Sequence, residues 1–150
     1  MQIIEFFEDN RKEHWKKEIA KADWGSADFL LELIDDRAKF NELLGEETKI
    51  YLLIDGDNIV SFATLAFQDC IRDESLYPWI GFVFTYPQYR GNRYSEQLLK
   101  YEEEQAKKAG RTKTYIATDH VGLYEKFGYQ YMETRVDYFG DESRIYYKEL

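Results

Sequence analysis

Hydrophobic residues recur at two different spacings, and the spacing changes several times along the sequence. Runs rich in β-branched and aromatic residues predict strands, and segments with apolar positions three or four residues apart predict helices. The predicted strands are 1–7, 48–54, 59–67, 78–85, 112–118, 129–138 and 144–148. The predicted helices are about 10–22, 26–44, 94–109 and 121–127.

Capping residues set the limits of the first two helices. Asp9 or Asn10 can cap the first, which is expected to end near residue 22. Ser26 is a favourable N-cap for the second, and Gly45 is typical of a helix end. The stretch between Ser26 and Gly45 is therefore predicted to form one continuous helix.

The helix 94–109 is predicted to be amphipathic. Its predicted buried stripe consists of Tyr94, Leu98, Leu99, Ala106 and Ala109. Its charged positions, Glu102-Glu103-Glu104 and Lys107-Lys108, are expected to face water, because charged residues normally occupy the side of a helix opposite its apolar stripe.

The middle of the chain is predicted to form a hairpin followed by a polar loop. Two β-rich runs flank an Asp-Gly turn at 55–58, which is a strong hairpin signal. The next segment, 68–75, carries Asp69, Asp73 and Glu74 and is expected to be a solvated loop.

The strand 78–85 is apolar almost throughout and is therefore predicted to be buried on both faces. A helix connects it to the strand 112–118, and a right-handed crossover of this kind places the two strands parallel. We therefore expect a mixed α/β fold of about seven strands, mostly antiparallel with a parallel fourth and fifth pair, and about four helices. Residues 1–150 are expected to form one domain.

Composition and charge narrow the class of function. The net charge of -9 argues against nucleic acid as a partner, which would require clustered basic residues. No apolar run is long enough to cross a bilayer, so no membrane partner is expected. The single Cys70 excludes an internal disulfide, and residues 1–5 lack a basic leader region, so the chain is expected to be cytoplasmic.

A glycine-containing loop lies between the strand 78–85 and the helix 94–109. A strand that turns directly into a helix exposes the free N–H groups of the first helical turn, and these attract anions. Arg90 and Arg93 lie in this loop, although the chain as a whole is acidic. The loop is therefore a candidate phosphate or pyrophosphate site, and the alternative is an ordinary loop with two solvated arginines.

Two segments carry a resemblance to a known family. The first runs from Val83 to Gly91, and the second is Leu123-Tyr124-Glu125-Lys126-Phe127-Gly128-Tyr129 after the intervening helix. Together they resemble the GNAT superfamily of acyl-CoA-dependent N-acyltransferases. Within the family's pyrophosphate-loop pattern, Arg93 replaces the central Gly and Ser95 replaces the last small residue.

The resemblance implies acetyl-CoA as cosubstrate and a fold of the GNAT type. Its diphosphate would bind the amides of the loop, and its pantetheine arm would bind the backbone of Val83 and Thr85. Tyr124 would meet the departing sulfur after direct attack by an amine. The loop residues concerned are Arg90, Gly91, Asn92, Arg93, Tyr94 and Ser95.

The general base is less defined by the sequence. His120 has a suitable unperturbed pKa and follows the fifth strand together with Asp119, although both could instead position the cofactor. Asp69, Asp73 or Glu74 is the other candidate for the base. His14 and His120 form no plausible ligand set with the scattered acids, so no metal is expected.

The acceptor is expected to be an amine-bearing small molecule or a peptide. Trp24 and Phe29 are candidates to contact it, or they are packing residues, and Asp69 and Asp119 are further candidates for acceptor binding. The resemblance also implies a possible homodimer. An alternative function is a catalytically silent domain that binds acyl-CoA as a sensor. A dinucleotide-binding domain is disfavoured because Gly-x-Gly-x-x-Gly is absent.

Overall fold

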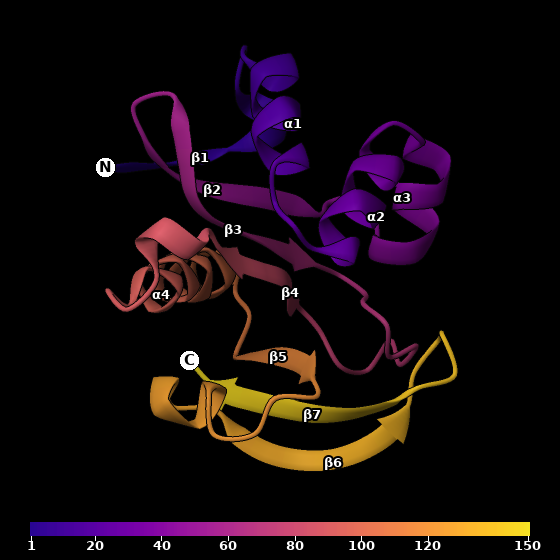
Figure 1. Cartoon of the computed structure of the whole chain (residues 1–150). Coiled ribbons are helices and arrows are strands. Elements are labelled where there is room, and N and C mark those ends of the chain that lie inside the picture. Colours follow the sequence, from indigo (N-terminus) through magenta and orange to yellow (C-terminus); the bar gives the residue numbers. More distant parts are fainter.

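One mixed sheet of seven strands forms the centre of the structure, a computed structural model that describes residues 1–150 (Figure 1). The strands lie in the order β1-β2-β3-β4-β5-β7-β6. Their bounds are Gln2–Glu5 (β1), Lys49–Asp55 (β2), Asn58–Ala66 (β3), Trp79–Thr85 (β4), Lys113–Thr118 (β5), Gln130–Val136 (β6) and Glu142–Glu149 (β7). The helices are Lys12–Ala20 (α1), Gly25–Ile34 (α2), Arg37–Leu44 (α3) and Tyr94–Lys108 (α4).

Helices cover both faces of the sheet and create two cores. Helices α1, α2 and α3 pack on one face around Trp15, Leu30 and Phe62, and α4 packs on the other around Leu98, Leu99 and others (Figure 1). None of the helices combines the length and the apolar character that a membrane span requires.

The predicted fold class is confirmed. All neighbouring strands run antiparallel except β4 and β5, which are parallel and connected through α4. Only one residue pair, Trp79 opposite Tyr115, joins these two strands. Beyond this pair the strands diverge, so residues 81–85 are only half-buried and the prediction of a strand buried on both faces is wrong for them.

Several element boundaries differ from the sequence prediction. The first strand ends at Glu5, and Phe6–Glu8 form a 3₁₀ turn. The predicted helix 26–44 is two helices, because the Asp36 carboxylate accepts a hydrogen bond from the Lys39 amide (3.3 Å) and starts α3. The predicted N-cap Ser26 lies inside α2, and the segment 121–127 contains only the 3₁₀ turn Tyr124–Phe127.

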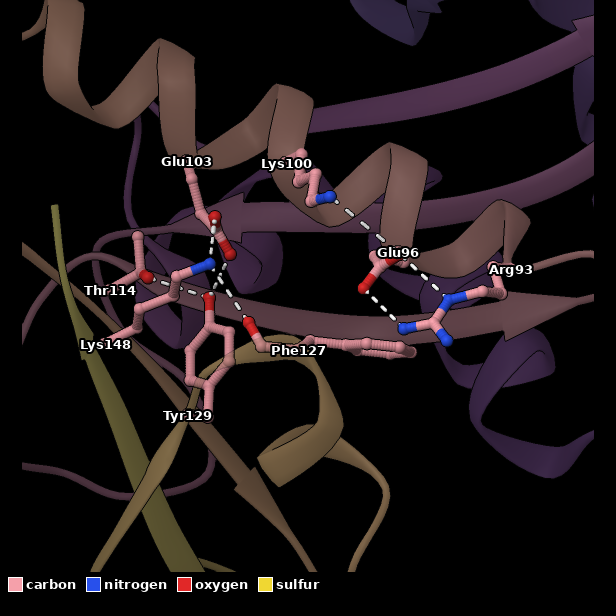
Figure 2. A network of polar contacts seen from close by, with 8 residues as sticks. All are labelled: Arg93, Glu96, Lys100, Glu103, Thr114, Phe127, Tyr129 and Lys148. Atoms are coloured by element: carbon pink, nitrogen blue, oxygen red, sulfur yellow. Dashed lines mark hydrogen bonds and ion pairs between the residues drawn. The ribbon is translucent and has the colours of Figure 1, made fainter.

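The prediction for the charged side of α4 is wrong at two acids. Glu102 and Glu103 are buried, whereas Ala109 is exposed. Glu103 accepts hydrogen bonds from Lys148 Nζ (2.9 Å) and from the Tyr129 hydroxyl (2.9 Å) (Figure 2). Because this carboxylate has two partners from the far end of the chain, its burial is compensated.

Glu102 has no such compensation. Its side chain is fully buried, and neither carboxylate oxygen has a hydrogen-bond partner. Burial, and secondarily the charge of Glu103, raises the pKa of Glu102 well above its ordinary value. The protonated form is therefore favoured in the folded protein, and stability falls as the pH rises above the ordinary pKa of a glutamate.

We expect Glu102→Gln to stabilise the protein at neutral pH, by about 1 kcal/mol or more, because folding no longer requires the buried carboxyl to take up a proton. The gain should shrink as the pH falls below about 4.5, where the wild-type side chain becomes protonated in the unfolded as well as the folded state. Urea unfolding at several pH values measures this difference. Glu104→Gln, on the exposed side of α4, is the control and should change stability by less than about 0.5 kcal/mol.

Candidate functional site

A cleft opens where β4 and β5 diverge. Its volume is about 320 Å³. It contains five residues that the sequence analysis selected: Trp24, Val83, Asp119, His120 and Tyr124. They come from three separate parts of the chain: the start of α2, the middle of β4 and the segment after β5.

A bulge in β4 shapes the cleft. Phe62 lies opposite Phe84 and Thr64 opposite Gly81, so two residues of β4 oppose the single Ala63 of β3. Phe82, in the bulge, has a left-handed backbone with φ of 50°. A bulge bends its strand and redirects its backbone groups, and here it lies where β4 has lost its pairing with β5. The β4 edge is thus open to an extended ligand.

The loop after β4 ends in the start of α4. Gly91 and Arg93 both have positive φ, of 87° and 58°. Arg93 therefore adopts the left-handed conformation that glycine accepts most readily, although it has a side chain. Tyr94 and Ser95 begin α4, and no backbone or side-chain group accepts a hydrogen bond from the amides of residues 91–96. These free amides can receive an anion.

The side chains of this loop have local partners. Arg90 Nε donates to the Thr85 carbonyl (2.9 Å). Arg93 donates to both carboxylate oxygens of Glu96, at 3.0 and 2.9 Å (Figure 2). Asn92 Nδ2 donates to the carbonyl of Tyr89 (3.2 Å). The Arg90 side chain is thus bound to the end of β4, and the Arg93 side chain is bound to an acid of α4.

Tyr124 lines the cleft from the 3₁₀ turn that follows β5. Its side chain is 6 % exposed and packs edge-on against Phe127 and Tyr129. Burial raises the pKa of Tyr124 to about 12, and its hydroxyl makes no hydrogen bond within the protein. The hydroxyl is therefore protonated at neutral pH and free to donate a hydrogen bond to a ligand.

Asp119 and His120 lie at the end of β5 and are exposed. The His120 amide donates to Thr118 Oγ1 (3.1 Å), and neither side chain has a hydrogen-bond partner. Trp24 forms the other side of the cleft and stacks on Phe84, with ring centroids 5.5 Å apart. The structure brings no group of three His, Cys, Asp or Glu side chains into an arrangement suited to a metal.

Phe29 and Asp69 do not line the cleft. They lie together in a smaller neighbouring pocket, where Phe29 packs on Phe82 and Phe139. The expectation of a solvated loop is wrong for Asp69, because its Oδ2 is buried without a partner and burial raises its pKa to about 6.

The other two acids of the loop lie apart from the cleft. Asp73 is bound by Arg135 (2.8 Å), and Glu74 is exposed.

Sequence reasoning missed Gly81 and Phe82, both of which line the cleft. Gly81 could have been noticed, because a glycine inside a predicted strand often marks a bulge or the close approach of another group. Nothing in the sequence indicated that Asp69 is the group that approaches it.

Comparison with known proteins identifies the family. The sequence model described as the acetyltransferase (GNAT) domain matches residues 10–132. No curated protein matches the chain in sequence.

Solved structures share the fold over the whole chain. An aminoglycoside 6'-N-acetyltransferase complexed with coenzyme A is 16 % identical with a TM-score of 0.69, covering 99 % of this chain and 97 % of that one. The aminoglycoside 6'-N-acetyltransferase of Enterococcus faecium is 17 % identical with a TM-score of 0.70 and the same coverage.

A GNAT family acetyltransferase of Elizabethkingia anophelis with bound acetyl-CoA is 20 % identical with a TM-score of 0.60, covering 79 % of this chain and 82 % of that one. The family model, which spans most of the sequence, and the shared fold lead to one conclusion: this chain belongs to the GNAT acetyltransferase family.

Proposed function

We propose that the protein transfers an acetyl group from acetyl-CoA to the primary amine of a small molecule or peptide. The observation that carries this proposal is the open β4 edge, with free amides at its α4 end and the unpaired Tyr124 hydroxyl in the same cleft. Structures of the same fold hold coenzyme A or acetyl-CoA.

The cofactor would extend along β4. Its diphosphate would accept hydrogen bonds from the free amides of residues 91–95, since the Arg90 amide already donates to the Pro87 carbonyl (3.3 Å), and its pantetheine arm would pair with the backbone of Val83 and Thr85. The Thr85 carbonyl already accepts from Arg90, but a carbonyl oxygen has a second lone pair. The left-handed backbone of Arg93 supports this arrangement, because it provides the geometry for which the family pattern uses glycine.

The reaction would proceed by direct attack. The amine nitrogen forms a bond to the thioester carbon, the tetrahedral intermediate breaks its C–S bond, and the electron pair leaves on sulfur. Complete proton transfer from a phenol of pKa about 12 to a thiolate of pKa about 8.5 costs about 5 kcal/mol. Tyr124 would therefore stabilise the leaving thiolate by donating a hydrogen bond, and protonation of the sulfur would be completed from solvent.

The ammonium form of the acceptor has to lose a proton before it attacks. His120 and Asp119 lie exposed on the cleft and have no partners, so His120 can exchange a proton with both ligand and solvent. Trp24 provides an apolar wall on the opposite side. The aminoglycoside acetyltransferases of the same fold support an amine as acceptor.

We expect Tyr124→Phe to lower kcat about 10- to 100-fold, because one hydrogen bond to a charged leaving group is worth about 1.5 to 3 kcal/mol. Affinity for acetyl-CoA should stay within about twofold, because the bond forms only as the thiolate departs. Thiol release measures the first quantity, and calorimetric titration measures the second.

Tyr131→Phe, on the exposed face of β6, is the matched control and should retain full activity. An unchanged kcat in Tyr124→Phe would contradict the role of this hydroxyl. Binding of acetyl-CoA by the wild type without turnover of any amine would instead favour a silent sensor.

We expect Glu96→Gln to tighten acetyl-CoA binding about 3- to 10-fold at low ionic strength, because the Arg93 guanidinium is released to the diphosphate. The effect should weaken as salt is added, since the Arg93 guanidinium is exposed. Arg93→Ala should weaken binding, and Glu104→Gln is the charge-matched control on the same helix. If Glu96→Gln leaves the affinity unchanged while Arg93→Ala also has no effect, Arg93 does not contact the cofactor.

A further inference from the structure

A partly buried polar network connects α4 with the 3₁₀ turn that carries Tyr124. Glu103 of α4 lies at its centre, and both of its carboxylate oxygens are bound (Figure 2). Oε1 accepts from Lys148 Nζ of β7, and Oε2 accepts from the Tyr129 hydroxyl. Lys148 Nζ also donates to the carbonyl of Phe127, the last residue of the turn (3.0 Å). One ammonium group therefore joins the helix to the turn.

Tyr129 provides a second connection. Its side chain is buried, and burial raises the pKa of its hydroxyl, so the hydroxyl keeps its proton and donates it to Glu103. The Thr114 hydroxyl, 2.8 Å away, therefore donates to Tyr129, because a hydroxyl has a single proton. Thr114 lies opposite Lys148 in the pairing of β5 with β7, so the sheet sets the positions of both residues.

The path of the Lys148 side chain depends on Gly128. A Cβ at residue 128 would lie 3.2 Å from Lys148 Cε, so the lysine passes directly beside the glycine. Gly128 also has a φ of 92°, a conformation that residues with a side chain rarely adopt. The absence of a side chain therefore serves both the turn and the lysine that binds it.

Tyr124 takes its position from its neighbours, because its hydroxyl has no hydrogen-bond partner within the protein. Its carbonyl accepts from the Tyr129 amide (3.1 Å). Its ring packs edge-on against Phe127 and Tyr129, with centroids 6.3 Å apart in each pair. The network binds both of these neighbours: Tyr129 through Glu103, and Phe127 through Lys148.

The turn has few contacts of its own. It is a single 3₁₀ turn of four residues, a conformation with poorer hydrogen-bond geometry than an α-helix. Its middle residues, Glu125 and Lys126, are exposed. The Tyr146 hydroxyl of β7 donates to the Glu125 carboxylate (3.3 Å) and holds the first half of the turn to the sheet. Lys148 holds the last residue, and it is the contact that also binds α4.

We propose that Lys148 is a positioning residue for acetyl transfer: by joining Glu103 to the Phe127 carbonyl, it holds the Tyr124 hydroxyl where the departing sulfur can accept its hydrogen bond. Lys148 does not line the cleft, so it acts through Tyr124 and not on the ligand. A displacement of about 1 Å at a reacting centre can lower a rate about 100-fold. This inference rests on the proposed acetyl transfer and adds a residue to its machinery.

Lys148→Met keeps the length of the side chain and removes the ammonium group. We expect kcat to fall about 5- to 20-fold, while affinity for acetyl-CoA stays within about twofold, because the loop amides are unchanged. Lys148→Arg can donate to both oxygen atoms and should retain at least about one third of the wild-type kcat. Lys107→Met removes an exposed lysine of α4 and is the control, which should behave as wild type.

A loss of stability is the competing explanation, because Lys148→Met leaves Glu103 without its cation. The double variant Glu103→Gln/Lys148→Met removes both charges and should recover most of the melting temperature that Lys148→Met loses. It still lacks the bond to the Phe127 carbonyl, so its kcat should stay at the level of Lys148→Met. Recovery of kcat together with the melting temperature would overturn the inference.

The Tyr124→Phe background tests the route of the effect. If Lys148 acts through the Tyr124 hydroxyl, Lys148→Met should lower kcat by less than about twofold once that hydroxyl is absent. An equal loss of kcat in both backgrounds would overturn the positioning role and leave acetyl transfer intact.

Isotope-edited NMR of the tyrosine Cζ atoms tests the geometry without turnover. The Tyr124 resonance is the one that Tyr124→Phe removes. We expect it to shift or broaden in Lys148→Met and in the double variant, and to stay close to its wild-type position in Lys148→Arg and Lys107→Met. A displaced resonance supports the anchor even if no amine is acetylated. An unchanged resonance overturns the anchor even if acetyl transfer occurs.

Discussion

The cleft exists because the pairing between β4 and β5 is short. A single residue pair joins these strands, and it is fixed by the packing of Trp79 and Tyr115 with Ile71 and Ile145. Because this apolar cluster secures the strands at one end, they can separate at the other without breaking the sheet. The separation leaves a strand edge without a neighbour in the middle of the protein, where water or a ligand has to satisfy it.

The arrangement of strands could be predicted from the sequence because it follows from local signals. The Asp-Gly turn at 55–58 predicted the hairpin of β2 and β3. The apolar run before Arg90, with the helix after it, predicted that β4 and β5 are parallel. Sequence reasoning predicted that the segment from Val83 to Gly91 and Tyr124 belong to one site. The structure brings Val83 and Tyr124 into the same cleft.

The features that could not be predicted depend on partners far away in the sequence. Glu103 resembles its solvated neighbour Glu104, and only Lys148 and Tyr129, which come from the end of the chain, explain its burial. Asp69 belongs to a loop of polar sequence, yet its carboxylate is buried because it lies against Gly81 of the next strand. The break at Asp36 was missed because apolar spacing continues on both sides of it.

Lys148 has a consequence for the geometry of the whole site. Its ammonium group donates to Glu103 of α4 and also to the Phe127 carbonyl (3.0 Å), in the 3₁₀ turn that carries Tyr124 (Figure 2). The helix whose first turn has free amides and the 3₁₀ turn that carries Tyr124 are thus tied through one cation. This tie sets the distance between the loop amides and the Tyr124 hydroxyl, so any one molecule that contacts both has to be long enough to span it.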